Sequence, residues 1–318
     1  MSVDAERIAA PAAAHLGAGV RIEALAPLAG GASRELWRFD AVLPGGERVP
    51  LVLRRDPEGR EDPDAREREW AVLCAAWAHG VPVPEPLWRG EDEIVMRRVA
   101  GEAIPRRILR DHGAVHDRLT DQLAAAAAAT HAVPLAEVPA LPAPGGEPAA
   151  AAVDALAAQL DATGEPHPAL ELGLRWLRAH PPPPRPPALV HGDFRLGNFL
   201  VGPEGLDAVL DWELCHAGDP IEDLGWLCIR SWRFGNDDRP AAGVGTRERL
   251  RAAYAAAGGA DVGAEELRFW EVFGNVRWGV ICILQAGVHL SGERPSLELA
   301  AIGRRTCEPE WDLLAMLG

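Results

Sequence analysis

The sequence has 318 residues and a formal net charge of −15, from 47 acidic against 32 basic side chains, so it repels nucleic-acid backbones and we expect no nucleic-acid partner. It contains no run of about 18 uncharged apolar residues and no basic, apolar leader, so we expect no membrane span and a cytoplasmic location. A chain of this length corresponds to about two domains, or two lobes of one.

Residues 20–54 predict three antiparallel strands, because short Gly and Pro clusters separate their apolar runs. Asp62 and Pro63 then predict the start of a helix, since an acidic capping residue stands before a proline at the first helical position. Gly80 and Pro82 predict its end.

Within this predicted helix, Glu69 shares an apolar stripe with Leu73 and Ala76, so its carboxylate needs a partner. One more strand is expected to run through Met96 into a connector that ends near Gly101.

Helical patterns dominate from Pro105 onward. Two proline-rich loops, at 138–148 and 181–187, bracket a helical segment near 150–179, and residues 246–318 read as amphipathic helices. Short strands are expected at 188–190 and 206–210, with a turn at 202–205 before the second.

We therefore expect an α+β protein with two lobes. Residues 1–100 would form a small antiparallel β lobe that binds a nucleotide, and residues 101–318 a larger, mostly helical lobe that carries the catalytic residues and the substrate site. A cleft between two lobes is a preferred place for a ligand.

The densest chemical signal is His191-Gly192-Asp193, followed by Asn198 and by Asp211 at the end of an apolar strand. Phosphoryl transfer needs a group that accepts the proton of the attacking hydroxyl and oxygen ligands that hold Mg²⁺. An aspartate and an asparagine five positions apart can point from one loop toward one place. These residues therefore predict a kinase site.

The segments LVHGDFRLGNFLV and LDAVLDWELCHAGDPIEDLGW resemble the catalytic loop and the metal-binding segment of the aminoglycoside phosphotransferase family, which has the protein-kinase-like fold. The resemblance extends over nearly the whole chain. It implies that Asp193 is the catalytic base and that Asn198 and Asp211 hold Mg²⁺. The implied substrates are ATP, with GTP as a possible donor, and a small-molecule hydroxyl acceptor.

The resemblance also implies a nucleotide site on the first lobe. Arg54 would orient the phosphates, Glu69 would pair with Arg54, Val52 would lie over the base, and the connector after Met96 would offer backbone groups to the adenine edge. The loop that covers the nucleotide would contain three small residues: Gly30, Gly31 and Ser33.

Two features depart from the familiar pattern. The family usually has a lysine where Arg54 stands, and arginine at this position resembles the kinase-like module found beside some acyl-CoA dehydrogenases. Asp211-Trp212-Glu213 replaces the Asp-Phe-Gly of protein kinases, and no activation loop follows. A small-molecule acceptor is therefore expected instead of a protein.

Two alternatives remain open from the sequence. The first is a nucleotide-binding pseudokinase with a regulatory role, suggested by the missing lysine. The second is a metal-dependent hydrolase that would use His191, Asp193, Asp211 and His216. The oligomeric state is left open as well.

Several residues near the motif have either a structural or a substrate-binding reading. His191 is expected to hold the loop by hydrogen bonding, and Asp223 to cap backbone amides or brace the loop. Glu213, Asp219 and Glu222 could attract a cationic sugar such as an aminoglycoside, while hydroxy acids, amino alcohols and other metabolites are further acceptors that the resemblance implies.

Overall fold

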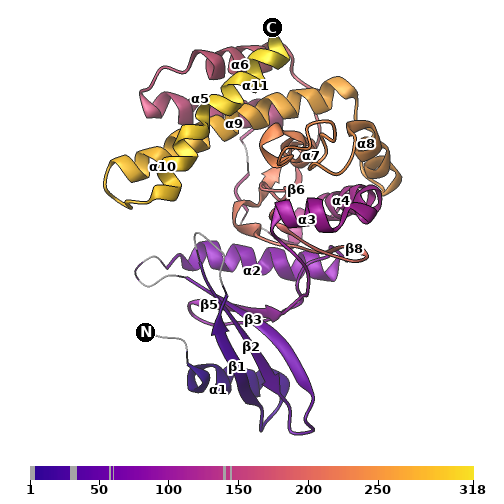
Figure 1. The fold of residues 1–318 in the computed structure, drawn as a ribbon, viewed down its shortest axis with the longest axis vertical. Helices are drawn as coiled ribbons and strands as arrows, with labels where there is room; N and C mark the ends of the chain where they lie inside the picture. Colours follow the sequence, from indigo (N-terminus) through magenta and orange to yellow (C-terminus); the bar gives the residue numbers. More distant parts are fainter. Residues whose placement is uncertain (1–3, 29–33, 57–58, 60, 139–140, 144) are drawn as a thin grey trace.

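A computed structural model describes residues 4–28, 34–56, 59, 61–138, 141–143 and 145–318. The chain forms an antiparallel sheet with two helices at one end of the molecule and a mostly helical body at the other (Figure 1). The expected α+β, two-lobed fold is confirmed. None of the helices in the described residues is both long and apolar enough to cross a membrane.

The N-terminal lobe contains a five-stranded sheet in the order β1-β2-β3-β5-β4, in which all neighbours are antiparallel. Its elements are α1 (Ala5–Leu16), β1 (Arg21–Pro27), β2 (Glu35–Val42), β3 (Arg48–Arg55), α2 (Pro63–Ala78), β4 (Pro86–Arg89) and β5 (Glu93–Arg97). The three strands predicted in 20–54 and the strand through Met96 are confirmed. The sequence reading missed α1 and β4.

Alternation along β3 sends its side chains to two different layers. Leu51 and Leu53 are fully buried in a cluster with Ile8 of α1. Val52 faces the opposite side and packs against the cluster that contains Val72 of α2. The sheet therefore lies between α1 and α2, and the second face is the one that points toward the helical lobe.

Helix α2 begins and ends where the sequence predicts. The Asp62 carboxylate accepts a hydrogen bond of 2.9 Å from the backbone N–H of Ala65, which caps the helix, and Gly80 has a φ of +76° beyond its end. Glu69 and Leu73 are each 2% exposed, so the predicted stripe is buried.

The C-terminal lobe is built mainly from helices. These are α3 (Pro105–Asp111), α4 (His116–His131), α5 (Pro148–Thr163), α6 (Pro168–Ala179), α7 (Ile221–Cys228), α8 (Arg247–Ala256), α9 (Ala264–Leu290), α10 (Leu297–Gly303) and α11 (Cys307–Leu317). The segment predicted as helical near 150–179 is two helices, because Gly164 adopts a left-handed conformation at the end of α5.

Two small antiparallel ribbons complete this lobe and hold the predicted motif. β6 (Ala188–Val190) pairs with β9 (His216–Gly218), and β7 (Phe199–Gly202) pairs with β8 (Gly205–Val209). The sequence reading identified β6 and β8 but did not name β7 as a strand and missed β9. Residues 191–198 connect β6 to β7, and residues 210–215 connect β8 to β9, so both connections run between the two ribbons.

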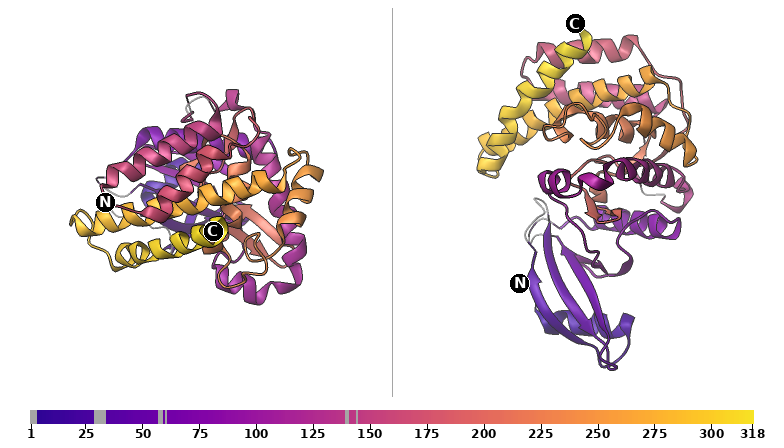
Figure 2. Two further views of the ribbon diagram at one scale, coloured as in Figure 1. Left: turned by 90° about the horizontal axis from the view of Figure 1, so that it is seen from above. Right: turned by 45° about the vertical axis from the view of Figure 1, so that its right-hand side comes forward.

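The connection between the lobes lies beside the β7–β8 ribbon. Glu102 exchanges backbone hydrogen bonds of 2.9 and 3.0 Å with Val201, and the N–H of Val209 donates to the carbonyl of Pro82 at 2.7 Å. Helix α2 also contacts the turn Trp212–Leu214. In Figure 1 and the right-hand view of Figure 2, the sheet projects to one side and α2 lies at the junction.

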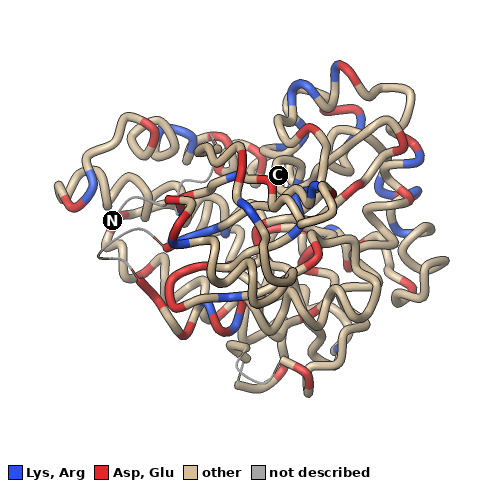
Figure 3. The backbone as a smooth tube through the Cα atoms, turned by 90° about the horizontal axis from the view of Figure 1, so that it is seen from below, with Lys and Arg blue, Asp and Glu red and all other residues tan. Residues whose placement is uncertain are grey.

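Acidic and basic residues are interspersed along the chain instead of being separated into single-sign regions (Figure 3). Many of them form ion pairs, such as Arg249 with Asp121 at 2.7 Å and Arg185 with Glu266 at 2.9 Å. The net acidity is thus spread over the surface.

One close helix crossing supports the catalytic region from behind. Gly225 of α7 lies against α9, and a Cβ at this glycine would collide with the side chain and backbone of Trp270. Trp270 is fully buried and cannot move aside, since protein cores are close-packed.

We expect Gly225→Ala to lower the free energy of unfolding by about 2–3 kcal/mol, because overpacking forces α7 and α9 apart. Chemical denaturation measures this change. Gly287→Ala on α9 is the matched control, since nothing lies within 4 Å of its added methyl group, and it should leave stability unchanged or raise it by up to about 1 kcal/mol. Equal effects of the two substitutions would contradict the account.

Candidate active site

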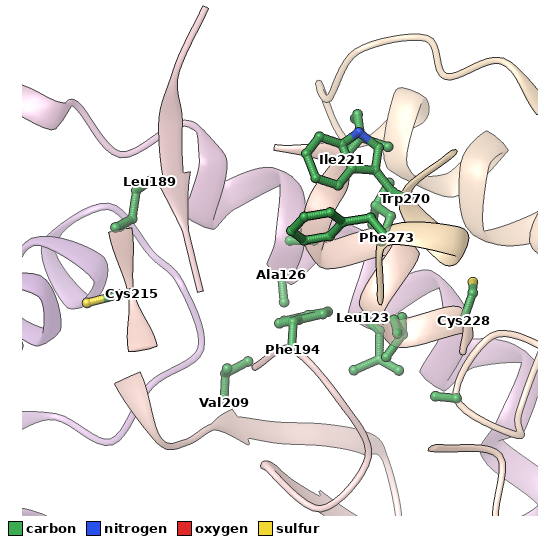
Figure 4. Close-up of a cluster of buried hydrophobic side chains, with 14 of the residues drawn as sticks. Leu123, Ala126, Leu189, Phe194, Val209, Cys215, Ile221, Cys228, Trp270 and Phe273 are labelled. Carbon is green, nitrogen blue, oxygen red and sulfur yellow. The ribbon is translucent and has the colours of Figure 1, made fainter. Parts of the chain in front are cut away.

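The catalytic loop, residues 191–198, leaves β6 and enters β7. Phe194 anchors it, because its ring is fully buried and lies among Leu123, Ala126 and Val209 in the main core (Figure 4). With the aromatic side chain held inward, the neighbouring Asp193 and Arg195 side chains are left at the surface of the loop, where both are partly exposed.

Hydrogen bonds from His191 hold the loop, as the sequence predicts. Its Nδ1 lies 3.1 Å from the backbone nitrogen of Asp193, and its Nε2 lies 3.0 Å from the carbonyl oxygen of Leu210. The Asp193 N–H makes Nδ1 an acceptor, so the proton of the neutral ring belongs on Nε2, where it donates to Leu210. The imidazole therefore joins the loop to the segment before Asp211.

Asp223 braces the same loop from α7, which confirms the structural reading. Its carboxylate is fully buried and accepts from the backbone N–H groups of His191 at 2.8 Å and Gly192 at 3.0 Å, with His131 Nε2 3.1 Å away. Burial would raise the pKa of Asp223, but the hydrogen bond and charge of His131, with His191, outweigh it and hold the pKa below its usual value.

Three side chains donate hydrogen bonds to the Asp193 carboxylate. Arg195 Nε lies 2.9 and 3.1 Å from its two oxygens, the Trp226 indole N–H donates to Oδ1 at 2.8 Å, and Asn198 Nδ2 donates to Oδ2 at 2.7 Å. The Asp193 side chain is 13% exposed. The structure thus brings the predicted base and the predicted metal-binding asparagine into direct contact.

The chain before Asp211, beyond the end of β8, is bonded to the catalytic loop through its backbone. The N–H of Leu210 donates to the backbone oxygen of Asn198 at 2.8 Å, and the Leu210 carbonyl lies against His191. Asp211 itself adopts φ 68° and ψ 67°, a left-handed conformation that is uncommon for a non-glycine residue. Such strain is typical of functional sites, and here it turns the chain sharply at the predicted metal ligand.

Arg54 and Glu69 form the predicted pair on the N-terminal lobe, with Arg54 Nη2 bonded to Glu69 Oε2. Burial, and then the charge of Arg34, lowers the pKa of Arg54 to about 10, while Asp211 and Glu213 act in the opposite direction. Asp211 is thus near enough for its charge to act on Arg54, across the junction of the lobes. The guanidinium stays charged at neutral pH.

Val52 and Met96 occupy directly opposed positions on β3 and β5, and Val52 shares its face of β3 with Arg54. Val52 is partly exposed, whereas Met96 is 9% exposed. The predicted loop residues Gly30, Gly31 and Ser33 lie outside the described residues.

A second charged cluster lies behind Trp226. The Arg277 guanidinium stands 4.8 Å from the centre of the Trp226 ring and donates to Glu222 at 3.1 Å, and His216 Nε2 lies 3.2 Å from the same carboxylate. Burial would lower the pKa of His216, but the charge and hydrogen bond of Glu222 raise it to about 9. Glu222 is therefore already committed to two cations.

Sequence reasoning considered Glu213, Asp219 and Glu222 as attractors of a cationic sugar. Two of them are buried and do not face solvent as that role requires: Glu222 is 4% exposed and Asp219 is 1% exposed. Asp219 accepts from the Ile221 N–H at 2.9 Å and its second oxygen is buried without a partner among the described residues. Only Glu213 is exposed.

Asp219 gives a pH-dependent prediction. Burial raises its pKa from 3.8 to about 7, so the stability that this one carboxyl contributes is fully present below about pH 4 and is lost as the pH rises through 7, where the folded chain must bury a charge. We expect Asp219→Asn to raise the free energy of unfolding by about 1–3 kcal/mol above pH 7, with little effect at acid pH.

Denaturation curves across this pH range test that expectation. Asp154→Asn, whose side chain is 74% exposed, serves as the control and should change nothing at any pH. A destabilisation by Asp219→Asn of the same size at both ends of the range would contradict the account, because the effect would not follow the titration of this carboxyl group.

Sequence reasoning missed the residues that position the Asp193 carboxylate. Trp226 lies 33 residues away from Asp193 along the chain, and no local pattern indicates that the indole returns to the loop. Arg195 stands within the motif itself, two residues after Asp193, and its charge beside a predicted base was a signal that could have been used.

The hydrolase alternative required His191 and His216 to join Asp193 and Asp211 around a metal. Both imidazoles are directed elsewhere, His191 to Leu210 and His216 to Glu222. In the described part of the chain, no group of three or more His, Cys, Asp or Glu side chains is arranged to hold a metal ion.

Comparison with known proteins agrees with this geometry. The family model described as "Phosphotransferase enzyme family" matches residues 24–270, which include most of both lobes and the predicted residues Arg54, Glu69, Asp193, Asn198 and Asp211. The chain belongs to this family. It is thus a phosphotransferase by family, and the resemblance expected from the catalytic loop and the metal-binding segment is confirmed.

Among known family relatives, the mouse protein named acyl-CoA dehydrogenase family member 10 is 28% identical over 314 residues, covering 84% of this chain and 27% of the mouse protein. The chicken acyl-CoA dehydrogenase family member 11 is 32% identical over 190 residues, covering 55% and 24%. The chain therefore spans about a quarter of the length of these relatives. They confirm the branch suggested by Arg54.

Solved structures share the fold. A Ralstonia eutropha protein assigned as an aminoglycoside phosphotransferase superposes with a TM-score of 0.72 at 24% identity, and each chain covers 97% of the other. A macrolide 2'-phosphotransferase of Brachybacterium faecium superposes with a TM-score of 0.63 at 21% identity, over 96% of this chain and 97% of that protein. This confirms the protein-kinase-like fold of the family.

Proposed function

We propose that this protein transfers the γ-phosphate of ATP to a hydroxyl group of a small molecule, with Mg²⁺ and with GTP as a possible second donor. The observation that carries the proposal is the contact of Asp193 with Asn198 on one loop, which Leu210 joins to the turn at Asp211, while Arg54 pairs with Glu69 on the other lobe. This arrangement supplies a base, two oxygen ligands and a phosphate-binding cation.

The donor set fits a magnesium ion. The Asn198 side chain donates from Nδ2 to Asp193, which leaves its side-chain oxygen, Oδ1, to bind a cation. The Asp211 carboxylate adds a charged oxygen from the adjoining turn. Mg²⁺ prefers one or two carboxylates together with substrate phosphates over a full protein cage. Bound there, Mg²⁺ would neutralise charge on the phosphates.

Asp193 would accept the proton of the acceptor hydroxyl. As the hydroxyl oxygen forms its bond to the γ-phosphorus, the bond from that phosphorus to the bridging oxygen breaks, and the nucleoside diphosphate leaves with the electron pair. Trp226 and Asn198 fix the orientation of the carboxylate through hydrogen bonds of 2.8 and 2.7 Å. The contribution of the chain is therefore mainly the positioning of charge and of the base.

The N-terminal lobe would hold the nucleotide. Arg54 offers a planar fork of donors to phosphate oxygens, and Glu69 keeps that fork in place from α2. We keep Gly30, Gly31 and Ser33 as the covering loop and Val52 with the segment after Met96 as the base site. Residues 1–100 and 101–318 remain the proposed nucleotide-binding and catalytic lobes, and the cytoplasm the proposed location.

The acceptor is proposed to be a metabolite instead of an aminoglycoside. Glu222 and Asp219 are buried, and Glu222 already binds Arg277 and His216, so two of the three acids that could attract a cationic sugar are committed elsewhere.

A screen of hydroxylated metabolites for Mg²⁺-dependent ATP consumption tests the proposal. Consumption that needs both the acceptor and Mg²⁺, together with a phosphorylated product, would support it. Binding of Mg-ATP, seen as a rise in the unfolding temperature, without consumption of any acceptor would favour the pseudokinase alternative. Activity in the absence of nucleotide would contradict the assignment.

A further inference from the structure

The Asp193 carboxylate has no room left for the acceptor in the arrangement described above. An ionised carboxylate offers about four lone-pair sites. Arg195 Nε lies within hydrogen-bond distance of both oxygens, and Trp226 and Asn198 each take one more site. An incoming hydroxyl must therefore displace one of three donors before Asp193 can accept its proton.

Two of those donors are fixed by their surroundings. Trp226 is 3% exposed and its ring packs against Trp232 and Trp278, at centroid distances of 5.3 and 6.5 Å. Asn198 is 6% exposed and its amide also donates to the Asp193 backbone oxygen at 3.0 Å. Moving either side chain would disrupt the core or the loop itself.

Arg195 is the donor that can leave. Its side chain is 25% exposed, and apart from Asp193 its only other hydrogen bond among the described residues runs from Nη1 to the Leu196 oxygen at the limiting distance of 3.5 Å. Its guanidinium carbon lies 4.6 Å from the centre of the Trp232 ring, so a cation–π contact stabilises the guanidinium independently of Asp193.

The space around the guanidinium favours such a movement. Gly197 has a φ of +115°, and a Cβ there would lie 2.7 Å from Arg195 Nη1. The chain thus turns beneath the guanidinium without a side chain in its way. A guanidinium matches the oxygens of a phosphoryl group better than an ammonium does, because it presents several N–H donors in one plane.

We infer that Arg195 is a second phosphate-binding cation and a catalytic residue, which caps Asp193 in the empty enzyme and moves onto the transferring phosphoryl group when nucleotide and acceptor bind. This inference rests on the proposed function. In the reaction the acceptor proton passes to Asp193, the P–O bond to the leaving diphosphate breaks, and Arg195 donates to the non-bridging oxygens of the transferring group. Arg54 would hold the phosphates from the other lobe.

A double-mutant cycle separates this role from mere positioning of Asp193. Single-turnover consumption of Mg-ATP, including slow transfer to water, is measured for wild type, Arg195→Ala, Asp193→Ala and the double variant, so no acceptor needs to be known. We expect Arg195→Ala alone to lower the rate about 10²–10³-fold, and to lower the residual rate of Asp193→Ala about tenfold or more. No further loss in the Asp193→Ala background would show that Arg195 acts only through Asp193, and would overturn the inference.

Chemical rescue provides a second readout. Millimolar guanidinium chloride should restore part of the activity of Arg195→Ala, whereas urea, which has a similar shape and no charge, should not at matched ionic strength. The unfolding temperature checks that the variant folds, and Arg195→Lys, which keeps a cation, should fall between wild type and Arg195→Ala. Lack of rescue by guanidinium in a folded variant would count against the inference.

Arg305→Ala is the matched control, because its guanidinium also stands over a tryptophan, 5.2 Å from the Trp278 ring, without contacting Asp193. It should retain the wild-type rate. A wild-type protein that consumes nucleotide while Arg195→Ala does so equally well would overturn the inference and leave the proposed function intact. A wild-type protein that neither binds nor consumes nucleotide would overturn both.

Discussion

Asp193→Ala should lower kcat by about 10²–10⁴-fold, equivalent to about 3–5 kcal/mol, while the Kd for Mg-ATP changes little. The substitution removes the carboxylate that would accept the proton, whereas the Arg54–Glu69 pair proposed to hold the phosphates lies on the other lobe and is left unchanged. Steady-state rates with an identified acceptor, combined with calorimetric binding of nucleotide, measure the two quantities separately.

The unfolding temperature is the control that shows whether Asp193→Ala is folded. Because the backbone N–H bond of Asp193 to His191 Nδ1 does not involve the side chain, Asp193→Ala should fold, with a moderately lower unfolding temperature since Trp226 and Asn198 lose an acceptor. Turnover within about threefold of wild type in a folded variant would remove Asp193 from the role of base.

Asp211→Asn should lower kcat by about 10²–10³-fold and raise the Mg²⁺ concentration needed for half-maximal activity. The loss follows from removing a negative charge at the proposed metal ligand. Asparagine tolerates the left-handed conformation that Asp211 adopts at φ 68°, so the backbone should be preserved. Magnesium titrations of the initial rate, at saturating nucleotide, give both quantities.

Asp207→Asn is the matched control for this prediction, because it removes the same charge from an exposed position on β8, the strand that leads to Asp211. Its magnesium dependence should equal that of wild type. If Asp211→Asn kept the wild-type magnesium dependence as well, Asp211 would not be a metal ligand.

Much of the fold was readable because the signals are local. The strands in 20–54 are separated by glycine and proline turns, and α2 begins at a capping Asp62 that bonds the N–H of Ala65. Glu69 predicted a buried partner because burying an unpaired carboxylate in an apolar stripe costs free energy. Arg54 is that partner.

The elements that sequence reasoning missed depend on distant partners or on weak patterns. β9 has three residues and exists through its pairing with β6, which lies far back in the chain. α1 did carry a signal, since Asp4 caps its first turn and Gly17 follows its last residue, but an internal Pro11 obscured the pattern.

The same division applies to the site. The roles of Asp193, Asn198 and Asp211 were predicted from one stretch of sequence, and the structure brings that stretch together through Leu210, which bonds both Asn198 and His191. The indole of Trp226 could not be placed in advance, because it reaches Asp193 only after α7 packs behind the loop. Long-range packing, not local pattern, decides which donors surround the base.

The proposed reaction requires that Asn198 and Asp211 hold a metal ion beside Asp193. A crystal structure of the protein soaked with Mn²⁺ and a non-hydrolysable ATP analogue tests it most directly, since manganese is located by its anomalous signal. The account predicts a manganese peak in contact with the Asp211 carboxylate and the Asn198 carbonyl oxygen, with the phosphates between Arg54 and Asp193. Manganese and nucleotide bound elsewhere, with these two side chains left without metal, would contradict it.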